Sequence, residues 1–246
     1  VEMSTKIEYT TAESLNTTMP TRKLLDILKS LPGSDDVTID VSDTKATIKS
    51  GKSRFVLATL PGEDFPYEES SVDCNFKIAV KDLDSLISQT SFSMAVQDAR
   101  HFLNGLFLEV LNDKITVVTT DGHRLSLSAS NQSNIVDTDV NCIIPRKCIV
   151  EIKRLLSSFK DNSDHIAEFM INKGEIIFKI SEYVIKSKLI EGSYPDYKKV
   201  FPESLPYKLN VNREDLRAAL LRMSILSNEQ FKGVKLSLSK SEIMIS

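Results

Sequence analysis

The sequence predicts an α+β protein built from repeated domains, each made of two units of strand, helix and several strands. A proline, a basic pair, an amphipathic helix and three short strands follow one another from Pro20, and the same order returns 125 positions later from Pro145. A second pattern, a strand followed by a helix, begins at Phe76 and returns 131 positions later at Tyr207. A fixed internal period is the signature of a repeated architecture, so we expect a domain of roughly 125–130 residues.

The first copy of the proline pattern is read as the end of a short strand followed by a helix, over residues 19–28. The run Leu31-Pro32-Gly33 ends this helix, because proline and glycine are poor continuations of a helix. Short strands are expected over 37–41, 46–50 and 54–59, followed by a turn-rich tail over 60–66.

The second copy of the pattern begins at residues 144–152. Its helix carries four apolar residues at helical spacing, which predicts one buried stripe: Ile149, Ile152, Leu156 and Phe159. Short strands are expected over 166–171, 175–180 and 183–188, followed by a tail at 194–197.

These correspondences predict three domains. Residues 71–202 form a complete middle copy, 1–70 form the C-terminal part of a first copy, and 203–246 form the N-terminal part of a third. The chain is therefore expected to be cut at both ends. The stretches 61–71 and 195–206 are rich in proline and polar residues, as connections between domains tend to be.

A hairpin is predicted where Asp121-Gly122 separates two β-rich runs, 114–120 and 124–129. Asp-Gly favours a type I′ turn, which needs positive φ at both central residues. The segment 102–108 is apolar and is expected to form the neighbouring strand. Leucines on either side of the polar pair His123-Arg124 suit a shallow groove with an apolar floor, although most Asp-Gly pairs are simply turns.

Composition excludes several classes of function. The chain has 246 residues, 41% hydrophobic and 26% charged, with no run long enough to span a membrane and no visible secretory signal. Its three cysteines form no CxxC pair, which fits a reducing cytoplasm rather than a disulfide framework or a zinc site. The closest glycines, Gly51 and Gly62, are too far apart for a dinucleotide fingerprint or a P-loop. HExxH is absent, and nothing indicates catalysis, a metal or a cofactor.

Positive charge is concentrated on the predicted helices. Together the four helices carry +6, whereas the whole chain carries −3. For one helix, a solvated surface is the simpler explanation. For a repeated domain with basic helices and an acidic remainder, the pattern favours a surface that faces phosphates and does not read base sequence.

The chain resembles the bacterial replicative sliding clamp, the beta subunit of DNA polymerase III. The resemblance runs almost end to end and depends on five motifs in order: 102–105, 120–125, 144–147, 194–197 and 226–229. It implies three similar domains per chain and a head-to-tail homodimeric ring with helices lining the hole. It also implies a non-enzymatic processivity factor that encircles double-stranded DNA. Through a short peptide motif, such a clamp tethers the replicative polymerase, the clamp loader and other replication and repair proteins.

The resemblance also implies three sets of site residues. The partner-peptide groove would comprise Leu103, Thr120, Gly122, His123, Arg124, Leu125, Pro195, Lys199, Val200 and Phe231. The DNA-facing residues would be Arg22, Gln97, Arg100, Phe102, Arg146 and Lys147. The dimer interface would pair Phe55 and Leu57 with Ile225 and Leu226. Two positions depart from the family pattern: Lys199 stands where relatives often have arginine, and His101 where they often have an aromatic residue.

Two alternatives remain. An enzyme would use Asp121, His123 and Ser126, but His123 and Ser126 point to opposite faces of an alternating strand, which is poor geometry for a triad. A structural protein without a nucleic-acid role would leave the basic helices unexplained. Retention on circular but not on linear DNA separates a clamp from both.

Overall fold

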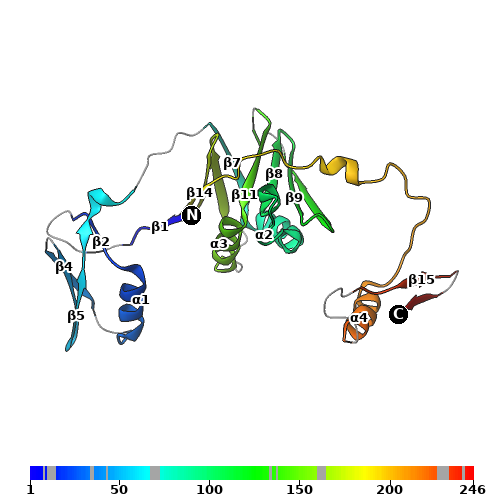
Figure 1. Ribbon diagram of the computed structural model, residues 1–246. Helices are drawn as coiled ribbons and strands as arrows, with labels where there is room; N and C mark the ends of the chain where they lie inside the picture. Colours follow the sequence, from blue (N-terminus) through cyan, green and yellow to red (C-terminus); the bar gives the residue numbers. More distant parts are fainter. Residues whose placement is uncertain are drawn as a thin grey trace. The chain divides into compact units, whose positions relative to one another are not determined.

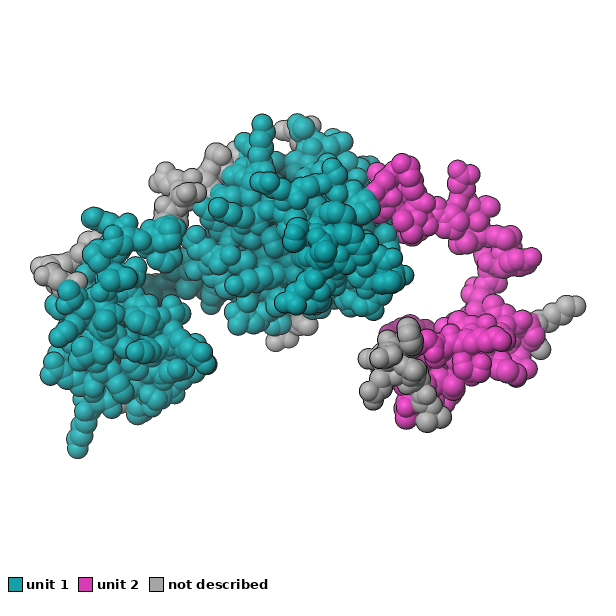
Figure 2. Space-filling model, in the orientation of Figure 1, with its two compact units in different colours: residues 1–195 teal, residues 196–246 magenta. Residues whose placement is uncertain are grey.

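The computed structural model describes residues 1–7, 9, 15–33, 36–42, 44–66, 73–132, 135–136, 138–159, 165–225, 233–239 and 242–246. The chain divides into two compact units, Val1–Pro195 and Asp196–Ser246, coloured teal and magenta in Figure 2. Most of the site residues predicted from the sequence belong to the first unit, so its architecture decides how they are arranged.

The middle part of the first compact unit consists of two successive repeats, each made of one strand, one helix and three strands. The first contains β7 (Cys74–Ala79), α2 (Val80–Thr90), β8 (Gly105–Leu111), β9 (Lys114–Thr120) and β10 (Leu125–Asn131). The second contains β11 (Val140–Pro145), α3 (Arg146–Ser157), β12 (Ile166–Ile171), β13 (Glu175–Ile180) and β14 (Tyr183–Lys188). The last three strands have the predicted bounds. Two short 3-10 turns, η2 (Ser91–Ser93) and η3 (His101–Leu103), lie between α2 and β8.

Each of these two strand-helix-strands repeats contributes its first strand to the sheet of the other repeat. The β7 strand pairs with β12, and β11 pairs with β8, both antiparallel. The sheets therefore have the orders β1-β14-β13-β12-β7 and β10-β9-β8-β11. The additional strand β1 (Glu2–Ser4) pairs with β14 at the edge of the five-stranded sheet.

The core lies between these sheets and the two helices. Figure 1 shows α2 and α3 next to each other on one side of the sheets, and the two helices are in contact. Ile149, Ile152 and Leu156 of the predicted stripe are buried on α3, and Phe159 packs against the same core. Phe178 on β13 has no exposed surface and contacts the ring of Phe169.

The segment before β7 follows the predicted order. It contains β2 (Thr17–Thr18), α1 (Thr21–Ser30), β3 (Thr38–Ser42), β4 (Lys45–Ser50), β5 (Ser53–Ala58), β6 (Leu60–Pro61) and η1 (Gly62–Asp64). The strands β3, β4 and β5 form a small antiparallel sheet that buries Ala46, Ile48 and Leu57. No residue of α1 is buried, although the helix contacts β5.

The second unit contains η4 (Tyr197–Val200), α4 (Arg213–Ser224), β15 (Leu236–Leu238) and β16 (Ile243–Ile245). Residues 207–211, the counterpart of β7, form no strand. The strand β7 itself pairs with β12, which lies far along the chain, and among the described residues no strand pairs with 207–211. In the described part of the chain, no helix is long and apolar enough to cross a membrane.

Candidate functional site

The predicted hairpin is present, but its turn differs from the expected one. Thr120 pairs with Leu125, so the loop has four residues, 121–124, and the prediction of a two-residue type I′ turn was wrong. Gly122 has a φ of +86°, whereas Asp121 is not in the positive-φ region. The reason is local: the Asp121 carboxylate accepts hydrogen bonds from residues later in the loop, which favours an Asx turn.

Asp121 organises this loop through both carboxylate oxygens. Its Oδ1 accepts the backbone N–H groups of His123 and Arg124 at 3.0 Å each, and its Oδ2 accepts Arg124 Nε at 3.1 Å. Partial burial alone would raise the pKa of Asp121, but these hydrogen bonds outweigh it and lower the pKa below its usual value. The carboxylate therefore stays charged, and the loop keeps its shape at neutral pH.

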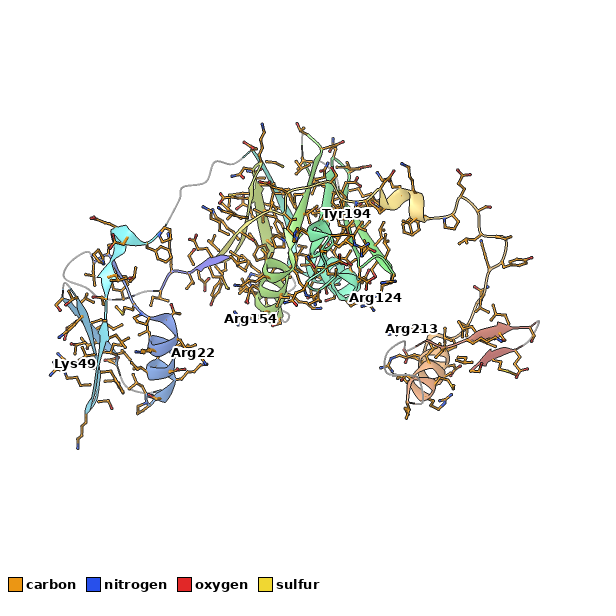
Figure 3. The ribbon with its side chains drawn as sticks, in the orientation of Figure 1. Arg22, Lys49, Arg124, Arg154, Tyr194 and Arg213 are labelled. Atoms are coloured by element: carbon orange, nitrogen blue, oxygen red, sulfur yellow. The ribbon has the colours of Figure 1, made fainter. Side chains whose placement is uncertain are left out.

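Arg124 also reaches back to the turn that follows α2. Its Nη2 donates to the Phe92 carbonyl at 2.9 Å, and its guanidinium carbon lies 5.9 Å from the centre of the exposed Phe92 ring. The Thr120 hydroxyl donates to the Arg124 carbonyl at 2.7 Å. These contacts hold Arg124, labelled in Figure 3, in one orientation while more than half of its side chain remains exposed.

The segment 94–104 between η2 and β8 runs beside the loop and is held by Asn104. The Asn104 amide donates to the Asp98 carbonyl at 2.8 Å and accepts the Asp98 N–H at 2.9 Å. Its backbone carbonyl accepts the N–H of Arg146, the first residue of α3, at 3.0 Å. Gln97 has a φ of +56°, a strained conformation for a residue with a side chain, so this segment has a defined shape. Sequence reasoning missed Phe92, Asp98 and Asn104; of these, only Asn104 stood inside a motif, 102–105.

The predicted groove residues differ in accessibility. Gly122, His123, Arg124 and Pro195 are exposed, Leu125 is half-buried and Thr120 is nearly buried. Leu103 is 2% exposed, so it is part of the buried core rather than of the open surface. Lys199 and Val200 are exposed in the second unit, and Phe231 lies outside the described residues.

The predicted DNA-facing residues lie on α1, on α3 and on the segment 94–104. Arg22 and Lys147 are exposed in the first turns of α1 and α3. Arg146 is half-buried and donates from Nη1 to the Met94 carbonyl at 3.2 Å, which ties α3 to the segment. Gln97 and Arg100 are exposed, and Phe102 is half-buried.

The predicted interface residues occupy two places. On β5, Phe55 is half-buried and Leu57 is buried, with 6% of its surface exposed. Val56, which lies between them, is exposed. Ile225 at the end of α4 is exposed, and Leu226 lies outside the described residues.

The hypothetical catalytic set is not assembled. The Asp121 carboxylate is bound by Arg124, and the hydroxyls of Ser126 and Ser93 share a hydrogen bond of 2.7 Å. Within the described residues, no hydrogen bond joins the His123 ring to Asp121 or Ser126, and no group of His, Cys, Asp or Glu side chains is arranged to hold a metal ion.

Tyr194, just before Pro195, packs beside the hairpin. Its ring stacks on Phe107 with centroids 4.8 Å apart. Burial raises the pKa of Tyr194 from 10.0 to about 12, and the nearby Thr120 backbone offsets part of this rise. Among the described residues, the buried Tyr194 hydroxyl has no partner that meets the geometry of a hydrogen bond.

Replacing Tyr194 with Phe is expected to flatten the alkaline limb of the stability curve. The fold favours the neutral phenol, so its stabilisation is complete below pH 10 and is lost as pH rises toward about 12. Urea unfolding from pH 8 to 12 measures the free energy of unfolding of wild type and Tyr194→Phe. The buried cysteine thiols affect its pH dependence equally in both proteins. Because the hydroxyl lacks a full partner, the substitution should cost less than about 1 kcal/mol at pH 8. Parallel curves up to pH 12 would contradict this explanation.

The chain is similar to known proteins over most of its length. The family model described as the DNA polymerase III beta subunit, central domain, matches residues 77–196, and the N-terminal domain model of the same subunit matches residues 1–69. The beta sliding clamp of Pseudomonas aeruginosa is 40% identical over 95% of this chain and 63% of that protein. The beta sliding clamp of Escherichia coli K12 is 34% identical over 93% of this chain and 62% of that protein.

Solved structures show the same likeness. A crystal structure of the Pseudomonas aeruginosa DNA polymerase III subunit beta has a TM-score of 0.85 at 39% identity, covering 93% of this chain and 62% of that one. A Bartonella birtlesii sliding clamp bound to griselimycin has a TM-score of 0.86 at 32% identity, with the same coverage. The chain thus spans less than two thirds of the length of these relatives.

Proposed function

Because this chain belongs to the family of bacterial DNA polymerase III beta subunits, the beta sliding clamps, and has their α+β clamp fold, we propose that its protein is a processivity factor. It encircles duplex DNA as a homodimeric ring in the cytoplasm and tethers the replicative polymerase, the clamp loader and other replication and repair proteins. It performs no catalysis and needs no cofactor. Its domains are 1–70, 71–202 and 203–246.

The pairing of β1 with β14 is the observation that carries the ring proposal. Shifted by the 125 positions between Pro20 and Pro145, β1 corresponds to residues within β10. The strand β1 is therefore the first copy's version of β10, and its pairing with β14 is a junction between successive copies. Repeating one heterologous junction from copy to copy gives a ring when the rotation closes.

This junction also supports the proposed dimer interface. The strand β5 follows α1 as β14 follows α3, so β5 is the first copy's version of β14. Among the described strands β5 pairs only with β4, which leaves one edge open for another subunit. We propose that Phe55 and Leu57 on β5 lie at this interface, and the family resemblance supplies Ile225 and Leu226 of a second subunit as their partners.

The proposed DNA surface consists of Arg22, Gln97, Arg100, Phe102, Arg146 and Lys147. Its cations come from helices α1 and α3 and from the segment 94–104. Such a surface neutralises backbone phosphates and allows the ring to slide.

The proposed peptide groove comprises Leu103, Thr120, Gly122, His123, Arg124, Leu125, Pro195, Lys199, Val200 and Phe231. The ligand is a short extended peptide with a polar residue, a leucine and a terminal aromatic residue or leucine. A small apolar contact of this kind supports at most about 8 kcal/mol, corresponding to micromolar binding. Lys199 keeps positive charge at the rim but lacks the flat guanidinium of arginine.

DNA retention tests the proposed function. A protein that contains this chain should stay on a circular duplex and slide off the same duplex once it is linearised. Binding to short duplexes should be independent of sequence, and Lys147→Gln should reduce the slope of log affinity against log salt by about 1. The matched control is Lys49→Gln, on β4 and paired with Asp40, which should leave the slope unchanged.

Two results would reject the proposal. Equal retention on circular and linear DNA would exclude encirclement, and the absence of any salt-dependent DNA binding would favour the structural alternative.

A further inference from the structure

One short segment carries residues that the proposed function assigns to two ligands. Within 94–104, Gln97, Arg100 and Phe102 belong to the proposed DNA surface, whereas Leu103 belongs to the proposed peptide groove. The single regular turn here is η3, so a few polar contacts decide the shape of the segment. A ligand that changes one of these contacts therefore affects both surfaces.

Arg100 is the contact that joins this segment to the hairpin. Its backbone N–H and its Nε donate to Asp98 Oδ1 at 2.8 and 3.0 Å, and its Nη2 donates to Oδ2 at 2.8 Å. The same Nη2 lies 3.4 Å from the Asp121 carbonyl, at the start of the hairpin loop. The Asp98 pKa is lowered to about 2, chiefly by the Arg100 side chain, so the pair stays ionised.

The hairpin loop rests directly on this guanidinium. A Cβ placed on Gly122 would lie 2.9 Å from Arg100 Nη2 and 3.0 Å from Nη1. With no side chain on Gly122, the loop backbone and the guanidinium can approach closely. Asp98 thus positions Arg100, and Arg100 supports the loop that presents His123 and Arg124.

Arg100 is nevertheless accessible to a third partner. Its side chain is 51% exposed, and a phosphate accepts the same forked N–H donors as a carboxylate does. A phosphate that engages these donors competes with Asp98 and draws the guanidinium away from the Asp121 carbonyl. The loop then loses its support on that side.

We propose that Asp98 and Arg100 form a latch that couples DNA binding to peptide binding, with opposite effects on the two ligands. With the latch closed, Arg100 supports the loop 121–124 and the peptide binds. With the latch open, Arg100 contacts a DNA phosphate and the peptide binds more weakly. This inference rests on the proposed function, because it assigns regulation to the same two surfaces.

Coupling of this kind is reciprocal, so DNA must weaken peptide binding by the same factor as peptide weakens DNA binding. For an exposed pair we expect the low end of the usual range, about fivefold. The probes are a short blunt duplex and a fluorescent peptide that combines a polar residue, a leucine and a terminal phenylalanine. Peptide affinity is measured by anisotropy at low salt, with and without saturating duplex.

Two substitutions distinguish a latch from a general structural defect. Asp98→Asn releases Arg100, so it should weaken peptide binding and strengthen duplex binding, whereas a misfolded segment would weaken both. Arg100→Lys keeps the charge but loses the fork. It should retain duplex affinity, weaken peptide binding and abolish the effect of duplex on peptide. Lys49→Gln removes an exposed ion pair elsewhere and should behave as wild type.

The outcomes separate the latch from the function on which it depends. If wild type binds both probes but neither affects the other, the latch is wrong and the proposed function stands. Coupling that persists in Arg100→Lys would mean that DNA blocks the groove directly, which also overturns the latch. If wild type binds neither probe, both proposals fail.

Discussion

Replacing Gly122 with Val is expected to reduce peptide affinity at least tenfold while DNA retention persists. Gly122 has a φ of +86°, which a β-branched residue adopts only with strain. The new Cβ would also meet the Arg100 guanidinium at 2.9–3.0 Å. Strain of about 1–3 kcal/mol is enough for such a loss, because tenfold corresponds to about 1.4 kcal/mol. Titration of the labelled peptide measures the change.

Gly174→Val is the matched control, because a Cβ at Gly174 would meet nothing within 4 Å and its φ is not in the left-handed region. This variant should bind the peptide as wild type does. Gly122→Ala should fall between wild type and Gly122→Val, since alanine brings the same Cβ without branching. Unchanged peptide affinity in a folded Gly122→Val protein would mean that the hairpin is only a turn.

Truncating Phe178 to Ala should cost about 3–5 kcal/mol of unfolding free energy. Phe178 is 0% exposed, and the centre of its ring lies 5.2 Å from the centre of the Phe169 ring. The Phe169 ring in turn stacks on Phe76. This aromatic row connects β13, β12 and β7. Its loss therefore loosens the five-stranded sheet at the place where β7, from the first strand-helix-strands repeat, pairs with β12 of the second. A domain with about 5–15 kcal/mol in total would become marginal.

Urea unfolding monitored by circular dichroism measures this loss. Ile166→Ala on β12 is the control, because Ile166 is 52% exposed and its truncation should change stability by less than about 0.5 kcal/mol. A loss below about 1 kcal/mol for Phe178→Ala would show that the aromatic row is not a rigid part of the core.

The sequence alone determined most of the elements and their repetition, although the strand expected at 207–211 did not form. The strands β12, β13 and β14 and the buried stripe of α3 follow from apolar periodicity within short windows, which reflects which face each residue turns to the core. The internal period likewise predicted two strand-helix-strands units in one domain. The location of the hairpin followed from Asp121 and Gly122, because their backbone preferences act between neighbours.

The tertiary structure alone decided how these elements join. The exchange of β7 and β11 between the two sheets links strands far apart in the chain, and no local pattern specifies such a partner. The four-residue form of the hairpin loop depends on how the Asp121 carboxylate is used. The hydrogen bond from Arg100 to the Asp121 carbonyl joins residues 21 positions apart. It forms only when the folded chain brings the two connecting segments together. Periodicity reports burial, whereas specific hydrogen bonds between distant residues depend on where the whole fold places them.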